Sequence, residues 1–301
     1  MPDEPIVICK MVGKVFAKSQ GIEVTALRNV NFQGHQGEVV GIIGPNGSGK
    51  TTLFRTIAGF LCLSSGSISV GGLLPKKALE KRMVGFLAEE PRFSQAMPVK
   101  DYWMSYVSLA RPSKPAHSFV SDAMGIGTFG DKRIGQLSRG MLQRFALSMC
   151  LAFPRQVYLL DEPTESLDVN FRWNLVDIIS MLRKQGAAIV YASHNLEEVA
   201  KICDRVLVMR KGQLHKEIVA VNTCIAKFRA PEGIAMPEEL AGTQVSVRGT
   251  EYEVEIPSDQ INNVCRFVLS QNGDIIEIRP RSLEDILKAS IMEDVNSEKI
   301  M

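Results

Sequence analysis

Residues 44–52 read GPNGSGKTT, and this stretch sets the architecture expected of the chain. It matches the pattern G-x-x-x-x-G-K-[ST]. The apolar run at 38–43 predicts a strand leading into it, and residues 51–58 predict a helix leading out of it. Glycines let successive backbone N–H groups approach phosphate oxygens, and a helix N-terminus adds partial positive charge. The sequence therefore predicts a phosphate-binding loop between a buried strand and a helix.

Every residue of this loop is a candidate for binding a nucleotide: Gly44, Pro45, Asn46, Gly47, Ser48, Gly49, Lys50, Thr51 and Thr52. Lys50 would neutralise the β and γ phosphates. The Thr51 hydroxyl is a candidate ligand of Mg²⁺, because magnesium prefers hard oxygen donors. The alternative is an ordinary turn in which the lysine is incidental.

The pattern of apolar residues divides the chain into an α/β part, residues 1–215, and a smaller α+β part, residues 216–301. Predicted strands alternate with helical patterns, at 38–43, 67–70, 84–88, 156–161 and 187–193. That alternation predicts parallel strands joined by crossover helices. The strand signal stops between Pro98 and Ile134, which predicts a helical insertion covering about residues 90–152.

Bulk composition excludes several classes of protein. The chain has 301 residues, 45% of them hydrophobic, and its 35 basic against 33 acidic residues give a net charge of +2. Such a balance gives no broad field for nucleic acid, which we do not expect as a partner. The six cysteines show no C-x-x-C pair, so we expect neither a disulfide framework nor a zinc site. Neither a secretory signal nor a membrane span is evident, and we expect a cytoplasmic protein.

Two further predicted strands end in residues with catalytic potential. QVYLL runs into Asp161 and Glu162, which we expect at the carboxyl end of the sheet. Asp161 is a candidate Mg²⁺ ligand, and Glu162 a candidate to orient or deprotonate an attacking water. His194 follows the strand at 187–193 and is a candidate to contact the γ-phosphate, with Asn195 and Glu198 capping the next helix. The alternatives are a solvated strand end for the acids and a capping or packing role for the histidine.

Five segments in order carry a resemblance to a known family: GPNGSGKTT, LSRGM at 137–141, VYLLDE at 157–162, SLD at 166–168 and SH at 193–194. They are similar to the Walker A, signature, Walker B, D-loop and switch-histidine motifs of the nucleotide-binding subunit of ABC ATPases. The resemblance covers about residues 5–212. It implies a P-loop NTPase fold of ABC type, with a mostly parallel core, an N-terminal antiparallel β part and a helical insertion.

In that family the signature caps the γ-phosphate of an ATP held by a second subunit. The resemblance assigns this role to Ser138, Arg139, Gly140 and Met141. It also implies that Asp168 links the two opposed sites and that Phe16 stacks on adenine. For Phe16 the alternative is an ordinary core aromatic.

The chain departs from the family pattern at two places. Arg139 and Met141 replace a glycine and the glutamine of the usual LSGGQ. FLAEEP at 86–91 puts Glu89 where the family usually has glutamine. A carboxylate there is a candidate Mg²⁺ ligand beside Thr51 and Asp161, and the alternative is a solvated loop acid.

The resemblance implies a Mg²⁺- and ATP-dependent ATPase subunit that dimerises around ATP, as a homodimer or a heterodimer. It would power a transmembrane permease formed by a separate chain and lie on the cytoplasmic face of a membrane through that permease. The run IEIRPRSLEDILKAS at 276–290 resembles the accessory region of ABC exporter subunits and favours export. The alternative for this run is an appendage that only packs against its own domain.

Two other functions stay open at this point. One is a soluble ABC ATPase that remodels a macromolecule, although such proteins usually carry two cassettes or a long coiled coil. The other is a nucleotide-gated regulator that hydrolyses ATP weakly, which Glu89 and Arg139 leave open and Glu162 argues against.

Overall fold

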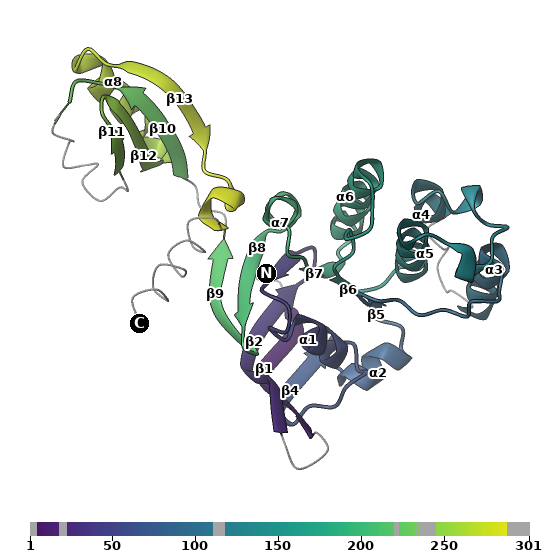
Figure 1. Ribbon diagram of the computed structural model, residues 1–301. Helices are drawn as coiled ribbons and strands as arrows, with labels where there is room; N and C mark the ends of the chain where they lie inside the picture. Colours follow the sequence, from purple (N-terminus) through teal and green to yellow (C-terminus); the bar gives the residue numbers. More distant parts are fainter. Residues whose placement is uncertain are drawn as a thin grey trace. The chain divides into compact units, whose positions relative to one another are not determined.

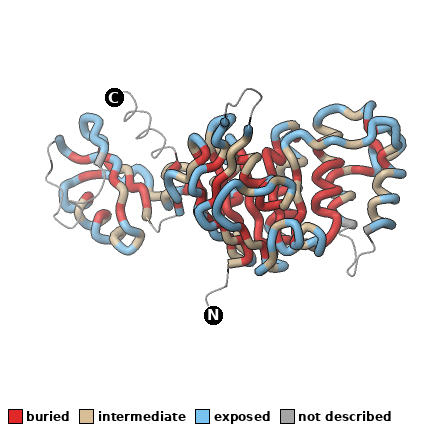
Figure 2. Tube along the Cα trace, turned by 90° about the horizontal axis from the view of Figure 1, so that it is seen from below, coloured by how far each residue is buried: buried red, intermediate tan, exposed pale blue. Residues whose placement is uncertain are grey.

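A computed structural model describes residues 5–17, 23–110, 118–219, 223–232, 234 and 245–287. The chain forms two compact units, residues 1–217 and 218–301. Figure 2 shows the buried residues as a continuous block within the first unit and as a smaller group within the second. No helix in the described ranges is long and apolar enough to cross a membrane.

A six-stranded sheet in the order β5-β6-β7-β3-β8-β9 forms the centre of the first unit (Figure 1). Its strands are β3 (Val39–Ile43), β5 (Val84–Leu87), β6 (Val157–Asp161), β7 (Ala188–Ala192), β8 (Arg205–Arg210) and β9 (Gln213–Val219). From β5 to β8 every neighbouring pair is parallel. All residues of β3, β6 and β7 are buried, as expected of parallel strands covered on both faces.

A second, antiparallel sheet has the order β2-β1-β4, with β1 (Pro5–Ala17), β2 (Glu23–His35) and β4 (Ser65–Val70). The prediction that the run at 67–70 joins the parallel series was wrong, since Val70 pairs antiparallel with Val7. A short apolar run indicates burial, but it carries no information about the direction of its neighbour. Helix α1 (Lys50–Ile57) shares one apolar core with both sheets, through Leu53, Phe54 and their neighbours.

The remaining helices of the first unit are α2 (Pro75–Glu80), α3 (Val99–Ala110), α4 (Ser118–Ala123), α5 (Arg139–Leu151), α6 (Val169–Lys184) and α7 (Leu196–Ile202), with short 3-10 turns η1 (Ile126–Thr128) and η2 (Ile134–Gln136). Helices α3, α4 and α5 form the helical insertion. Rings of Phe93, Tyr102 and Phe145 lie 5.0–5.7 Å apart and join α3 to α5. The breaker-rich residues 111–117 lie outside the described residues.

The second unit is a four-stranded antiparallel sheet in the order β11-β12-β10-β13. Its elements are β10 (Thr223–Arg229), β11 (Val245–Arg248), β12 (Glu251–Pro257), η4 (Ser258–Gln260), α8 (Ile261–Ser270) and β13 (Asp274–Pro280). Phe228, Val254 and Val264 belong to the apolar core of this unit. Alternate residues of the strands carry cross-strand ion pairs such as Lys227–Glu253 at 3.2 Å.

The run RPRSLED in the second unit forms a capped helical turn. Arg279 Nη1 donates to Asp285 Oδ2 at 2.7 Å, Ser282 N donates to the same oxygen at 2.9 Å, and Asp285 N donates to Ser282 Oγ at 3.1 Å. This reciprocal bonding is a capping box for the helical residues 283–287. The hydrogen bond from Arg279 is the main reason that the pKa of Asp285 lies below its ordinary value.

All six cysteines are free. Cys9, Cys150, Cys203 and Cys224 are buried, Cys265 is partly exposed and Cys62 is exposed. Burial raises the pKa of the Cys9 and Cys150 thiols to about 12, which keeps both protonated and unreactive.

Candidate functional site

The loop at 44–52 joins the end of β3 to the start of α1 and depends on two left-handed glycines. Gly47 has a φ of 79° and Gly49 a φ of 109°, conformations that residues with a Cβ rarely adopt. A Cβ at Gly49 would also lie 2.7 Å from the carbonyl oxygen of Ala26. Pro45, Asn46 and Gly47 are exposed, so the loop is open to solvent.

Lys50 lies inside this loop. Its side chain is buried, and Nζ donates to the carbonyl oxygens of Gly44 at 2.7 Å and Pro45 at 3.4 Å. The Oγ atom of Ser48 is buried without a hydrogen-bond partner among the described residues. A buried ammonium and an unpaired hydroxyl on a glycine-rich loop before a helix suit a phosphate.

Asp161 ends β6 and carries a second set of unpaired atoms. It is 1% exposed, and neither carboxylate oxygen has a hydrogen-bond partner in the described part of the chain. Burial raises the pKa of Asp161 to about 6, the nearby Thr51 hydroxyl opposes this rise, and the charges of Glu89 and Glu162 add to it. A buried carboxylate without partners is costly, and a divalent cation would satisfy it. The donor set therefore fits Mg²⁺.

The described residues contain no group of three His, Cys, Asp or Glu side chains placed to hold a metal ion. Mg²⁺ commonly binds one or two protein ligands together with phosphate oxygens and water. Asp161 and the Thr51 hydroxyl could hold the ion in this way. Glu89 is exposed beyond the end of β5, where its charge still acts on Asp161.

Glu162 and His194 meet at the same edge of the sheet. Nδ1 of His194 lies 2.9 Å from Oε2 of Glu162, and the Glu162 N–H donates to the carbonyl oxygen of Ala192 at 2.9 Å. Burial raises the pKa of Glu162, whereas the charge of His194 lowers it. A carboxylate with a raised pKa, oriented by an imidazole, is suited to accept a proton from water.

The prediction that Asn195 caps α7 is confirmed, since its side chain accepts from Glu198 N at 3.2 Å. The Glu198 side chain does not complete the cap as predicted. It accepts from Thr164 Oγ1 at 2.7 Å and from the Tyr191 hydroxyl. These bonds tie the segment after β6 to α7. The N-cap of α7 is Asn195 and not His194.

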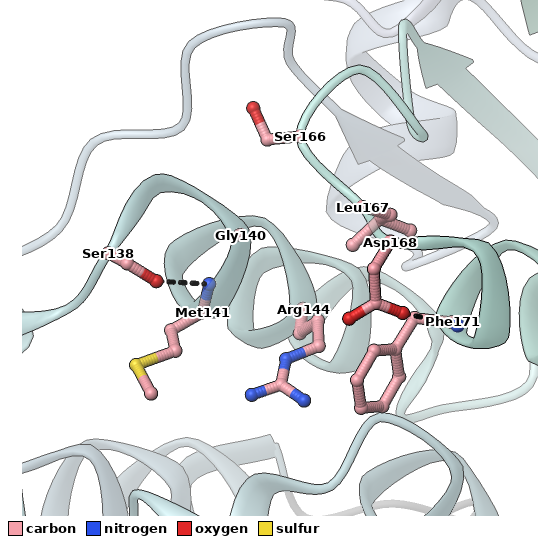
Figure 3. Close-up of a pocket in the computed structure, with 8 residues that line it drawn as sticks. All are labelled: Ser138, Gly140, Met141, Arg144, Ser166, Leu167, Asp168 and Phe171. Atoms are coloured by element: carbon pink, nitrogen blue, oxygen red, sulfur yellow. Dashed lines mark hydrogen bonds between the residues drawn. The ribbon is translucent and has the colours of Figure 1, made fainter.

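A pocket of about 230 Å³ lies between the start of α5 and the loop at 166–168 (Figure 3). Its lining residues are Ser138, Gly140, Met141, Arg144, Ser166, Leu167, Asp168 and Phe171. Ser138 caps α5 by accepting from Met141 N at 3.3 Å, and its hydroxyl hydrogen can still be donated to a ligand. Ser138 and Arg139 are exposed. A Cβ at Gly140 would lie 2.8 Å from the carbonyl oxygen of Ser166, so glycine permits this close approach.

Arg144 gives this pocket a positive charge. Its guanidinium lies 4.8 Å from the ring centroid of Phe129 and 4.0 Å from that of Phe171. Burial lowers the pKa of Arg144 and the charge of Asp168 opposes this effect. Asp168 caps α6 by accepting from Phe171 N at 3.2 Å. The pocket therefore presents hydroxyls, a guanidinium and a carboxylate at one surface.

The structure brings Lys50, Asp161, Glu162 and His194 to the ends of neighbouring strands β3, β6 and β7. Ser138, Gly140 and Met141 instead line the pocket at residues 166–168, whose lining includes none of these four residues. Phe16 on β1 is partly exposed, with Lys14 Nζ 4.9 Å from its ring centroid, and it lies outside the apolar core.

Sequence reasoning missed Gln143 and Arg144 on α5. Gln143 is buried, and its Nε2 donates to the carbonyl oxygen of Pro163 at 3.0 Å. A polar residue beside the apolar residues of an amphipathic helix is the signal that could have identified it.

The chain matches a family model described as ABC transporter over residues 27–165. It is 28% identical to the uncharacterized ABC transporter ATP-binding protein YdbJ of Bacillus subtilis (strain 168), over 99% of each chain. It is 32% identical to the taurine import ATP-binding protein TauB of Ruegeria pomeroyi, over 74% of this chain and 88% of that protein.

Solved structures share the fold of the first unit. The dimeric structure of a post-hydrolysis state of the ATP-binding cassette MJ0796, bound to ADP and Pi, superposes with a TM-score of 0.63. The match covers 71% of this chain and 98% of that one, at 20% identity.

Proposed function

The chain belongs to the family of ABC transporter ATP-binding proteins, and from this premise we propose that it powers a transporter whose permease is a separate chain. As a member of that family it is an ABC-type ATPase. One observation carries the assignment of the site. The unpaired carboxylate of Asp161 lies at the sheet edge shared by the buried Lys50 and the Glu162–His194 pair.

In the proposed site, residues 44–52 hold the triphosphate and Lys50 neutralises the β and γ phosphates. Mg²⁺, when bound, offsets phosphate charge, and Thr51 and Asp161 would hold it, with Glu89 as a further ligand from the loop after β5. Glu162 takes a proton from the attacking water. His194 orients Glu162 and contacts the γ-phosphate, and Phe16 stacks on adenine.

We further propose that two ATPase subunits close around ATP. The pocket at the start of α5 supports this, because its lining includes Ser138, Gly140 and Met141 but no residue of the 44–52 loop. In the dimer Ser138, Arg139, Gly140 and Met141 cap the partner's γ-phosphate, and Asp168 links the two sites. Loss of the γ-phosphate removes these contacts and opens the dimer.

The variant E162Q tests this function. The side chain keeps its shape but no longer accepts a proton, so turnover should fall by about 100-fold or more. Light scattering should then detect an ATP-dependent dimer. The matched control is E165Q, since Glu165 is an exposed acid three residues further along the chain. E162Q that stays monomeric at saturating Mg-ATP, or that keeps full turnover, would refute the shared-site mechanism.

The permease and the membrane location are tested by purification from solubilised membranes. A multi-span membrane protein should be retained with the tagged chain. Ribosomes or DNA in its place would favour a soluble ATPase that remodels a macromolecule.

The resemblance of residues 276–290 to exporter accessory regions supports export as the direction of transport. The relative TauB has import in its name, and the contacts of Arg279, Ser282 and Asp285 give the same run a structural role. Inside-out membrane vesicles that carry both subunits test the direction. After ATP is added, mass spectrometry of the vesicle contents should show a compound accumulating inside, with E162Q vesicles as control. Loss of a preloaded compound in place of accumulation would indicate import.

A further inference from the structure

Gln143 is a buried polar residue that joins the signature helix to the segment carrying Glu162. Its side chain is 6% exposed, and Nε2 donates to the carbonyl oxygen of Pro163 at 3.0 Å and of Glu162 at 3.4 Å. These two carbonyls belong to the peptide units that follow the Glu162 and Pro163 Cα atoms. One amide therefore holds the backbone next to the proposed catalytic carboxylate.

The backbone held in this way is in an unfavourable conformation. Glu162 has a φ of 48°, in the left-handed region, which is unfavourable for a residue with a Cβ. On one side the Glu162 N–H is fixed to Ala192 on β7 at 2.9 Å. On the other side the Gln143 amide holds the carbonyls. Strained backbone keeps its geometry only when neighbouring groups restrain it.

Gln143 also lies on the element that begins with the capping residues. Ser138 starts α5, and Gln143 follows about one and a half turns later. The rest of the helix is firmly packed, since residues 145–151 are all buried. Ser138 and Gln143 are joined by continuous helical backbone, so a displacement at the Ser138 end acts on Gln143 through that backbone.

We propose that Gln143 is a positioning residue that couples the two ATP sites of the dimer. When the start of α5 engages the ATP of the second subunit, the Gln143 amide sets the Pro163 carbonyl, and through it the carboxylate of Glu162 in its own site. This inference rests on the proposed shared-site function. It predicts that the Gln143 amide affects hydrolysis after ATP is bound, and leaves ATP binding and dimer closure intact.

Two substitutions remove the amide donor with little change in volume. Q143M leaves a side chain of similar length without a donor, and Q143E keeps the shape but places an acceptor against two carbonyl oxygens. For both variants at neutral pH, kcat should fall by about 10-fold or more. The KM for ATP should change by less than about threefold, and the ATP-dependent dimer should form as it does for E162Q.

The pH dependence of kcat in the two variants distinguishes a positioning role of Gln143 from general damage to the helix. The carboxyl introduced by Q143E can donate once it is protonated, and burial raises its pKa. The kcat of Q143E relative to wild type should therefore rise as pH falls from about 8 to about 6. The same ratio for Q143M should stay flat. The matched control is S148A, which removes a buried hydroxyl bonded to the Arg144 carbonyl oxygen at 2.9 Å on the same helix, and it should keep wild-type kcat.

Three outcomes would overturn the coupling role. These are a Q143M kcat within about threefold of wild type, a Q143M or Q143E protein that no longer dimerises with ATP, and a Q143E ratio as flat as that of Q143M. The variant S138D is the reference for loss of contact with the partner's γ-phosphate. Aspartate still caps helix α5, but its charge repels the partner's phosphates. Failure of the proposed function itself is distinct, since wild type and E162Q would then lack hydrolysis and dimer formation.

Discussion

Nδ1 of His194 lies 2.9 Å from Oε2 of Glu162, although 32 residues separate them in the chain. They meet because β6 and β7 are parallel neighbours whose carboxyl ends lie at one edge of the sheet. The side chain of Glu162 is 8% exposed and that of His194 is 66% exposed. The acid is thus largely shielded from bulk solvent, while the imidazole can reach a ligand.

We predict that H194A moves the acid limb of the pH–rate profile to higher pH. Burial raises the pKa of Glu162, and the charge of His194 counteracts this. A general base acts in its ionised form, which exists above its pKa. Removing His194 raises that pKa further, so the pH needed for half-maximal kcat should rise and kcat at pH 7 should fall by about 10-fold or more.

The measurement is kcat at saturating Mg-ATP over a range from about pH 5.5 to about pH 9. H215A is the matched control, because His215 is exposed on β9. An unchanged acid limb in H194A would mean that the imidazole does not tune Glu162.

We predict that D161N stabilises the ligand-free protein while abolishing Mg²⁺-dependent turnover. The pKa of Asp161 is about 6 in the fold, against an ordinary value of 3.8. A raised pKa means that the folded state holds this proton more tightly than the unfolded state, so ionisation weakens the fold as pH rises from about 4 to about 6. Asparagine removes this cost and should raise the free energy of unfolding by about 1–3 kcal/mol at pH 8, an advantage that disappears below about pH 4.

Denaturant unfolding at about pH 8 and about pH 4, with and without Mg-ATP, checks this prediction. Mg-ATP should stabilise wild type more strongly than D161N. D177N is the control, since Asp177 is an exposed acid on α6. A D161N protein less stable than wild type at pH 8 would show that the Asp161 carboxylate has a stabilising partner in the fold.

Much of the fold and the phosphate edge of the site is predictable from the sequence. Continuous apolar runs such as VYLLD mark fully buried strands, and their boundaries place Asp161, Glu162 and His194 at strand ends. The antiparallel pairing of β4 is not predictable in this way, because it depends on contacts with β1 about 60 residues earlier in the chain.

The part of the site that sequence reasoning missed depends on contacts between elements. The left-handed φ of Glu162 is stabilised by Ala192 on β7 and Gln143 on α5, and local sequence specifies neither bond. Arg144 reads as a solvated residue on an amphipathic helix, yet its guanidinium lies 4.8 Å from the ring of Phe129, just after η1, and 4.0 Å from that of Phe171 on α6. Helical periodicity places Gln143 beside the apolar face of α5, but it does not specify which backbone carbonyls the amide contacts.

We predict that D285N weakens the second unit near neutral pH and has little effect in acid. The hydrogen bond from Arg279 lowers the pKa of Asp285 in the fold, and bonds from Ser282 add to this effect. A lowered pKa gives stability that is present above the unfolded pKa, about 4, and is lost as pH falls below it. D285N should therefore lower the free energy of opening by about 1–2 kcal/mol at pH 7, and this difference should shrink below about pH 4.

Hydrogen exchange of the β10 and β13 amides measures this free energy of opening. The control is D274N, which changes an exposed acid at the start of β13. If D285N and D274N exchange alike at pH 7, the contacts of Asp285 do not stabilise this unit, and the run RPRSLED needs another explanation.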